Sequence, residues 1–443
     1  MAQHPGESGF LLLGDGIEAL ATRLLMAERA ELTLDAQYYL ITCDDIGYIF
    51  IGAMLAAADR GVRVRLLLDD ILTVGYDAGM AALDSHPNFE VRIFNPFGVR
   101  SARAAKFTDF GRINPRMHNK SITADNQVTV IGGRNIAAEY FAYRDDVNFS
   151  DVDVLAAGPV VQEVSTMFDL YWNSRYAAPI PSFAMMPEDP AVELKALRER
   201  IRTATAAAER TPYVDAFNES WNTYVVETGE TFDWAPYQLV YDSPDKADSE
   251  LASEADSIVT PLAAAINAAE RELTIISPYF IPLDTGIEGL AELQARGVQA
   301  NVVTNSFAAN NHAVVHSGCS PARKPLLRAG VRLFEVRPNA SVSGVDRGES
   351  GASLSTLHTK GFLIDREHLF LGSFNWDPRS AYINTELGVI IDSPSLGAFV
   401  DEQINLALNE KTFEVILDEQ DRLRWVDRSG AEEIVIDTEP QTT

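Results

Sequence analysis

Two stretches of the chain carry the same chemically capable residues in the same order. The first, MHNKSITADNQVTVIGGRN, contains His118, Lys120, Asp125, Gly132, Gly133 and Asn135. The second, LHTKGFLIDREHLFLGSFN, contains His358, Lys360, Asp365, Gly372, Ser373 and Asn375. Each residue of the second set lies 240 positions after its counterpart, in a chain with only seven histidines and seven lysines. The chain therefore contains a duplicated functional motif.

The spacing within each motif indicates what chemistry the residues can do. Side chains at i and i+2 of a strand project to one side, so each histidine and its lysine face the same way. Two copies related by a pseudo-twofold axis would bring two histidines, two lysines and two asparagines into one cleft. Such a cleft suits a phosphodiester, because cations and amides can hold its oxygens while one imidazole attacks phosphorus and the other protonates the leaving oxygen. This chemistry requires no metal ion and no cofactor.

Carboxylates are also needed, because a catalytic imidazole works best with an acid on its far ring nitrogen. Asp151 and Asp153 follow the first motif, and Glu386 follows the second. Asp125 and Asp365 lie at the turns between strands, where we expect them to hold the backbone through hydrogen bonds.

The elements that must position these residues are repeated as well. ELTLDAQYYLI from Glu31 matches ELTIISPYFIP from Glu272, and RGVRVRLLLDD from Arg60 matches RGVQANVVTNS from Arg296. Each stretch has the pattern of a buried strand, and helical patterns precede the strands. This alternation predicts an α/β fold of two tandem α/β/α domains, with mixed β-sheets flanked by helices and the active site at the pseudo-twofold interface.

The repeat also predicts the order of domains along the chain. We expect a first domain at 10–180, a connecting insertion at 181–250, a second domain at 251–410, and a C-terminal β-meander and tail at 411–443. The N-terminal residues do not form a signal-peptide pattern, and no apolar run approaches the roughly 20 residues that cross a bilayer.

The net charge limits which classes of molecule the protein is expected to bind. A net charge of −28 opposes general affinity for nucleic acid, because phosphates repel an acidic surface. One segment, 96–116, is instead basic and aromatic and leads directly into the first motif. Its composition favours contact with an anionic lipid surface, with a basic lip for a nucleic-acid strand as the alternative. The residues assigned to membrane or headgroup contact are Arg100, Arg103, Lys106, Phe107 and Phe110.

The duplicated His-x-Lys-x4-Asp motif resembles the signature of the phospholipase D superfamily. Stretches such as LDAQYY, TNSFAANNHAVVHSG and GSFNWDPRS are most similar to bacterial cardiolipin synthases of the cardiolipin synthase C group. The resemblance implies that His118 is the nucleophile that forms a phosphohistidine and that His358 is the general acid and later the base. It implies that Asp151 and Glu386 orient the imidazoles, with Asp153 as the alternative in the first half. Residues expected to bind substrate are Arg134, His316 and Arg379.

The activity implied by this resemblance is transfer of a phosphatidyl group to phosphatidylglycerol, with phosphatidylglycerol or phosphatidylethanolamine as donor. The alternatives are a phospholipase D that releases phosphatidic acid, a metal-independent phosphodiesterase or nuclease, and a catalytically silent lipid-binding protein. We expect phospholipid substrates, no nucleic acid, and a location peripheral to a bacterial membrane on its cytoplasmic side, or in the periplasm if a signal peptide has been removed. The sequence does not identify a small partner protein.

The sequence departs from that group in the segment GCSPARKPLLRAG, which contains Pro321 and Pro325. The group usually has an aromatic and basic helical stretch there, and proline interrupts helices. We therefore expect a different loop beside the second motif. The choice of acceptor among a second lipid, water and another alcohol stays open.

Overall fold

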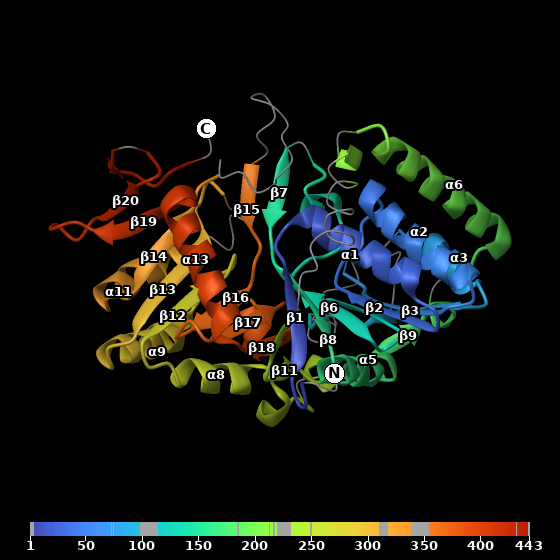
Figure 1. Ribbon diagram of the computed structural model, residues 1–443, viewed down its shortest axis with the longest axis horizontal. Helices are drawn as coiled ribbons and strands as arrows, with labels where there is room; N and C mark the ends of the chain where they lie inside the picture. The colour runs from blue at the N-terminus through green and yellow to red at the C-terminus, as the bar shows by residue number, and fades with distance from the viewer. Residues whose placement is uncertain are drawn as a thin grey trace.

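The computed structural model describes residues 4–97, 114–215, 218, 232–309, 318–338 and 354–441, apart from 72, 74, 145, 184, 185, 212, 249 and 431. Figure 1 shows two halves side by side, each a β-sheet covered by helices. The blue and green N-terminal half and the yellow and red C-terminal half meet through their sheets.

The first half is built on a sheet with the strand order β10-β1-β8-β6-β5-β2-β3-β4-β9. Strands β2, β3 and β4 are parallel, and the other neighbours are antiparallel. Its strands are β1 (Ser8–Leu13), β2 (Thr33–Tyr38), β3 (Arg63–Asp69), β4 (Phe89–Phe94), β5 (Ser121–Ala124), β6 (Val128–Gly132), β8 (Asp153–Ala157), β9 (Ala177–Pro179) and β10 (Asp233–Ala235). Its helices are α1 (Gly16–Arg29), α2 (Asp45–Asp59), α3 (Asp77–Asp84), α5 (Pro159–Trp172) and α6 (Pro190–Ala208), with the 3₁₀ turns η2 (Ala138–Phe141) and η3 (Ile180–Ser182).

The second half repeats this plan in the strand order β11-β18-β17-β16-β12-β13-β14-β19-β20-β21. Its strands are β11 (Tyr237–Tyr241), β12 (Glu272–Ile276), β13 (Gln299–Asn305), β14 (Arg332–Val336), β16 (Gly361–Ile364), β17 (His368–Gly372), β18 (Leu387–Asp392), β19 (Thr412–Leu417), β20 (Leu423–Asp427) and β21 (Ile434–Ile436). Its helices are α8 (Val259–Asn267), α9 (Leu283–Ala295), α11 (Arg323–Arg328), α12 (Pro378–Tyr382) and α13 (Pro394–Lys411), with η5 (Pro244–Ala247), η6 (Glu254–Asp256) and η7 (Ser320–Ala322). The predicted fold of two repeated α/β domains with mixed sheets is confirmed.

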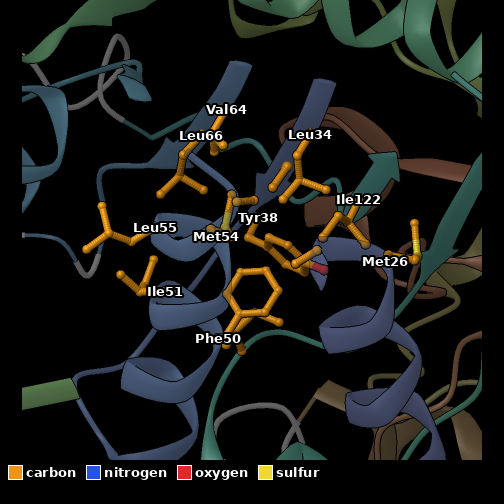
Figure 2. Close-up of a cluster of buried hydrophobic side chains, with 14 of the residues drawn as sticks. Met26, Leu34, Tyr38, Phe50, Ile51, Met54, Leu55, Val64, Leu66 and Ile122 are labelled. Carbon is orange, nitrogen blue, oxygen red and sulfur yellow. The ribbon is translucent and has the colours of Figure 1, made fainter. Parts of the chain in front are cut away.

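The core of the first half lies between its sheet and the helices α1 and α2. Figure 2 shows Met26 of α1 and Phe50 and Met54 of α2 gathered around Tyr38 of β2 and Ile122 of β5. The rings of Tyr38 and Phe50 meet edge to face with their centroids 5.7 Å apart. Burial of these side chains fixes the strands that lead into the first motif.

The segments outside the repeat extend the two sheets. Strands β10 and β11 are separated by one residue, yet β10 pairs with β1 in the first sheet and β11 pairs with β18 in the second. Helix α6 packs against α2 and α3, and strands β19 to β21 continue the second sheet beyond β14. Helix α11 forms despite its proline, because Pro325 lies in the first turn, where a missing N–H removes no bond within the helix.

The two halves are joined by an apolar interface and a small shared sheet. Inner-face residues of both sheets form one buried cluster, which includes Leu67, Ile131 and Val154 from the first half and Leu371 and Val389 from the second. Strand β7 (Val147–Ser150) of the first half pairs in parallel with β15 (Leu354–Leu357) of the second. This packing holds the loops at the interface in a fixed relation.

Each motif turns at its aspartate, which is held by the preceding part of the same half. The Asp125 carboxylate accepts hydrogen bonds from the backbone N–H groups of Glu31, Leu32 and Thr33. Asp365 accepts the equivalent bonds from residues 270–272. Both aspartates have a positive φ, 52° and 53°, a conformation that aspartate tolerates better than most residues. These contacts tie the hairpins that carry the motifs to β2 and β12.

Replacing Asp365 with alanine should therefore lower the free energy of unfolding by about 2 kcal/mol, because three backbone donors lose their acceptor and the left-handed turn becomes strained. Urea unfolding of the variant measures this loss. Asp437→Ala is the matched control, since Asp437 is mostly exposed and takes part in a surface ion pair with Arg424. Equal unfolding midpoints for the two variants would contradict the assigned role.

Candidate active site

Two buried histidine–carboxylate pairs lie at the boundary between the halves, and each pair combines residues from both. His118 Nδ1 lies 2.8 Å from Glu386 Oε2, and His358 Nδ1 lies 2.6 Å from Asp151 Oδ2. The histidines are only 9% and 7% exposed, and the two carboxylates are fully buried. With Nδ1 donating to a carboxylate, Nε2 of each ring is the nitrogen left for chemistry. The acid of each half therefore orients the histidine of the other half.

The exchange follows from how the backbones cross at the interface. The N–H of His118 donates to the carbonyl of Thr385, the residue before Glu386, and the N–H of Thr385 donates to the carbonyl of Arg116. In the other pair the N–H of His358 donates to the carbonyl of Ser150, the residue before Asp151. Each histidine is thus fixed to the segment that delivers its carboxylate.

The glycines of the motifs make room for these acid-bearing segments. A Cβ added at Gly132 would lie 1.9 Å from Asp153 Oδ1, and one added at Gly133 would lie 2.6 Å from Asp151 Oδ1. At Gly372 it would lie 2.3 Å from the carbonyl oxygen of Leu387. Real side chains do not approach other atoms this closely. The glycines therefore allow each motif to pack closely against the segment that carries its acidic residues.

Ser373 makes the two pairs electrostatically different. Its hydroxyl donates to Glu386 Oε2, whereas glycine occupies the equivalent position, Gly133, in the first half. Burial pushes the pKa of Glu386 upward, but His118, Lys120 and Ser373 outweigh it and hold this pKa below its usual value. Burial raises the pKa of Asp151 despite the opposing charge of Lys360. Glu386 is thus the more firmly ionised of the two acids.

The lysines bring buried positive charge to both rings. Lys120 Nζ donates to the carbonyl of His118 at 2.5 Å. Lys360 Nζ lies 2.7 Å from His358 Nδ1 and 3.1 Å from its Nε2. Burial lowers the pKa of His118 to about 4, although Glu386 opposes the shift. Burial also lowers the pKa of Lys360 to about 8 and that of Lys120 well below its ordinary value. Two buried ammonium groups beside the reactive rings can pair with an anionic ligand.

The two motif asparagines complete the lining of the site. Asn135 Nδ2 donates to the hydroxyl of Tyr140, which lies 3.5 Å from His358 Nε2. Among the residues that the structure describes, the side-chain oxygens of Asn135 and Asn375 are buried and find no hydrogen-bond donor. A buried acceptor without a donor is costly, so both oxygens are available to a donor such as a substrate hydroxyl.

Two residues considered from the sequence lie beneath the site instead of in it. Asp153 does not contact a histidine, because it forms buried ion pairs with Arg23 at 2.7 Å and Arg134 at 3.1 Å. The Arg134 guanidinium also donates to the carbonyls of Leu13, Gly14, Tyr140 and Asp151. The prediction that Arg134 binds substrate is therefore wrong, since its donors are occupied by the protein.

The other predicted substrate and membrane contacts lie at the edge of the site or outside the described residues. Arg379 is exposed and donates to the backbone and side-chain oxygens of Asn114 across the interface. His316 lies outside the described residues, and so do Arg100, Arg103, Lys106, Phe107 and Phe110.

Sequence reasoning missed a pair of buried side chains that anchor the residue before each histidine. Asp69 ends β3 and accepts a hydrogen bond of 2.8 Å from the N–H of Met117. Asn305 ends β13 and accepts one of 2.9 Å from the N–H of Leu357. Both belong to the repeated segments that begin at Arg60 and Arg296, so comparison of the two copies would have found them. Asp69 has a carboxyl group where Asn305 has a neutral amide, so the first half is the more acidic of the two beside its histidine.

Removing this anchor in the first half should slow catalysis, and it also lowers stability because Asp69 pairs with buried Arg116 at 3.5 Å. Asp69→Ala deprives the Met117 N–H of its acceptor and lets His118 shift, which we expect to lower kcat by about 10- to 100-fold. Asp69→Asn keeps an acceptor, as Asn305 does in the second half, and should recover most of the rate. Steady-state kinetics of the two variants test this, and equal losses in both would contradict an anchoring role.

The described residues show no other centre of this kind. Among them, no group of three or more His, Cys, Asp and Glu side chains is placed to hold a metal ion. No helix within those residues is long and apolar enough to cross a membrane.

Comparison with known proteins agrees with this geometry. The family described as "Cardiolipin synthase, PLD-like domain" matches residues 25–172 and 262–407. The chain is 40% identical to cardiolipin synthase C of Escherichia coli (strain K12) over 451 residues, which cover 100% of this chain and 93% of the relative. It is 25% identical to cardiolipin synthase A of Pseudomonas syringae, over 90% of this chain and 68% of the relative.

A solved structure shows the same fold. Phosphatidylserine synthase of Haemophilus influenzae superposes with a TM-score of 0.63 at 14% identity, over 92% of this chain and 87% of that one. Both family matches coincide with the two halves that supply the histidine–carboxylate pairs. The chain belongs to the cardiolipin synthase family and is a phosphatidyltransferase of the phospholipase D superfamily.

Proposed function

We propose that this enzyme transfers a phosphatidyl group from one phospholipid to the terminal hydroxyl of phosphatidylglycerol, which gives cardiolipin. The observation that carries the proposal is the pair of buried histidines, each oriented through Nδ1 by a carboxylate from the opposite half. Two separately oriented imidazoles allow one to act as nucleophile while the other moves protons.

In the first step, His118 Nε2 attacks the phosphorus of the donor lipid. A nitrogen–phosphorus bond forms, the bond to the leaving alcohol breaks, and protonated His358 gives its proton to the departing oxygen. In the second step, neutral His358 takes the proton of the acceptor hydroxyl, whose oxygen attacks phosphorus and releases His118. Glycerol leaves when phosphatidylglycerol is the donor, and ethanolamine leaves when phosphatidylethanolamine is the donor.

Burial lowers the pKa of both histidines, so the acid beside each ring is what favours His118 as the nucleophile. The low pKa of His118 leaves its imidazole neutral near pH 7, so the Nε2 lone pair is free to attack. Glu386 is held ionised by its neighbours and stabilises the positive charge that the ring gains as it bonds to phosphorus. His118 therefore does not have to lose a proton before its Nε2 attacks phosphorus.

The lysines are suited to the phosphoryl oxygens, because Lys120 and Lys360 bring positive charge from the two halves. The unpartnered oxygens of Asn135 and Asn375 can instead accept a hydrogen bond from a substrate hydroxyl. Negative charge builds on the phosphoryl oxygens in the transition state, where preorganised cations act most strongly. In the free site, burial and the neighbouring charge of Lys360 hold the pKa of His358 well below its ordinary value. The arriving anionic phosphodiester raises this pKa and so favours the protonated form needed in the first step.

The product distribution tests this proposal directly. Purified enzyme is incubated with vesicles of phosphatidylglycerol, with and without phosphatidylethanolamine, and the lipids are identified by mass spectrometry. We expect cardiolipin as the main product, with glycerol released from phosphatidylglycerol alone. Phosphatidic acid as the main product would show that water is the acceptor and would overturn the proposed transfer.

The location of the enzyme follows from its substrates. Cardiolipin synthases act on phospholipids, which lie in a bilayer, so we place the enzyme at a membrane surface. The cytoplasmic side, with the periplasm as the alternative, stays a prediction. The contact of Arg100, Arg103 and Lys106 with lipid headgroups stays a prediction.

The pH dependence of kcat/KM should report the buried lysines. Lys360 is cationic below its pKa of about 8 and neutral above it, so phosphodiester binding by the free enzyme weakens as the pH rises through this value. We expect kcat/KM to fall about tenfold per pH unit above about pH 8. In Lys360→Arg the guanidinium stays charged, so the part of the decline that Lys360 causes should disappear, although the maximum is lower and Lys120 still titrates. An unchanged decline in Lys360→Arg would exclude Lys360 as its source.

A further inference from the structure

An apolar pocket of about 450 Å³ lies between α8 and α9, on the outer face of the second sheet. Its floor includes Leu262, Leu290, Phe362, Phe374 and Trp376. The volume lies in the range of sites that hold small ligands, which are also mainly apolar.

The equivalent place in the first half is filled. Helices α1 and α2 correspond to α8 and α9, and they pack directly against each other. Figure 2 shows Met26, Phe50 and Met54 occupying the space above the sheet there. The pocket in the second half is open to solvent, so its apolar lining stays in contact with water unless a ligand covers it. The second half therefore retains an opening that the first half closes.

The mouth of the pocket is also apolar. Leu283 and Tyr382 line it and are 47% and 68% exposed, respectively. Leu283 has a φ of +53°, which leucine rarely adopts, and sits at the start of α9. Strained residues of this kind gather at functional sites. Exposed apolar side chains around an apolar opening favour entry of a ligand without charge.

The pocket and the active site share one short segment of the chain. Phe374 and Trp376 line the pocket, and Asn375 between them carries one of the unpartnered amide oxygens of the site. Two hydrogen bonds hold the backbone of Trp376. Its backbone N–H donates to the hydroxyl of Ser277, and its carbonyl accepts a bond of 2.7 Å from the N–H of Ile281. The same short segment therefore borders both the active site and the pocket.

The charges around the pocket indicate which part of a lipid enters. Glu288, Glu292 and Asp377 line it, so an anionic headgroup or a free fatty acid would be repelled. The buried lysines of the catalytic cleft attract the phosphate instead. A phospholipid satisfies both regions when its phosphate lies in the cleft and an uncharged hydrocarbon chain lies in the pocket.

We propose that this pocket binds an acyl chain of the phospholipid substrate and so makes the enzyme selective for long-chain lipids. The proposal rests on the proposed function only in taking a phospholipid as the substrate. It assigns to α8, α9 and α12 a role in substrate choice that is separate from the histidine chemistry.

Gly289 of α9 offers a way to fill the pocket without disturbing the fold. It lines the pocket, and a Cβ added there meets no atom within 4 Å. Gly289→Phe places a ring in the opening and removes a helix-destabilising glycine, so the variant should fold at least as well as the parent. Gly79→Phe is the matched control, because Gly79 lies in α3 of the first half and also has open space around it. Ala263→Phe fills the pocket from α8 and checks the result with a second variant.

Chain-length selectivity is the first readout. We measure kcat/KM with dioleoyl and with dihexanoyl phosphatidylglycerol. Gly289→Phe should lower the value for the dioleoyl lipid by about tenfold or more and leave the dihexanoyl value within about twofold, since only the long chain loses buried contact. Gly79→Phe should change neither. Equal effects on both lipids, or no effect on either in both pocket variants, would overturn the proposal.

Contact with the chain is measured separately from activity. Phosphatidylglycerol with dibromostearoyl chains quenches tryptophan on contact, so it should quench Trp376 in the parent and lose this effect in Gly289→Phe. Trp376→Phe identifies the contribution of that tryptophan. If the parent releases phosphatidic acid instead of forming cardiolipin, the proposed transfer fails, yet selectivity and quenching still decide the pocket. Quenching of Trp376 that persists in both pocket variants would exclude the chain from this site.

Discussion

Replacing His118 with alanine should reduce phosphatidyl transfer by at least about 10³-fold, because no other group can form the bond to phosphorus. The loss should appear in kcat more than in KM, since Lys120 and Lys360 still hold the phosphodiester. Cardiolipin formation from phosphatidylglycerol vesicles, measured by mass spectrometry, gives the rate.

The control must remove a histidine with a carboxylate neighbour outside the site. His368→Ala serves this purpose, because His368 lies at the start of β17 and pairs with Asp392 at 3.1 Å on the exposed surface. This variant should keep the parent rate. A His118→Ala enzyme that retains more than a few per cent of the activity would contradict the covalent mechanism.

The crossed carboxylates provide the second large effect. Glu386→Gln and Asp151→Asn each remove the acceptor charge from one histidine, and the loss of such an orienting acid lowers kcat by about 10⁴-fold in the best-studied hydrolase triad. We expect decreases of about 10²- to 10⁴-fold in both variants.

The crossing itself is tested by the histidine signals in an NMR spectrum of enzyme labelled with ¹⁵N-histidine. Glu386→Gln should shift the ring resonances of His118 and leave those of His358 in place, because Glu386 lies against His118 alone of the two. Asp151→Asn should do the reverse. If each acid affected the histidine of its own half, the exchanged pairing would be wrong.

The repeated α/β fold and the meeting of the two motifs at one site were predictable from the sequence. Residues 240 positions apart repeat the same chemistry, and the helices and strands before them repeat as well, so a duplicated α/β fold is the simplest reading. The turn aspartates could also be assigned, because their position between two strands leaves them close to backbone N–H groups.

The exchange of carboxylates could not be predicted in this way. Asp151 follows His118 along the chain, and only the packing of β7 against β15 shows that it reaches His358. Asp151 and Asp153 are two residues apart and look equivalent in sequence, yet Arg23 and Arg134 bind one of them. Contacts across an interface depend on three-dimensional packing that a local pattern does not contain.

The role of Arg134 illustrates the same limit. An arginine beside a catalytic asparagine suggests a phosphate contact, but this side chain is fully buried and joins β1, β8 and η2 from below the site. The sequence does not show whether the arginine side chain points into the active site or into the protein interior. Burial decided between a substrate contact and a structural one.

The covalent intermediate is the central claim, and one measurement tests it most directly. In His358→Ala, a dihexanoyl phosphatidyl ester of p-nitrophenol can still react with His118, because p-nitrophenolate leaves without being protonated. Water or a lipid hydroxyl then lacks its general base, so the intermediate should accumulate. We predict a burst of one p-nitrophenolate per enzyme and a phosphatidyl adduct on His118 by mass spectrometry. Release without an adduct, or an adduct on another residue, would contradict the account.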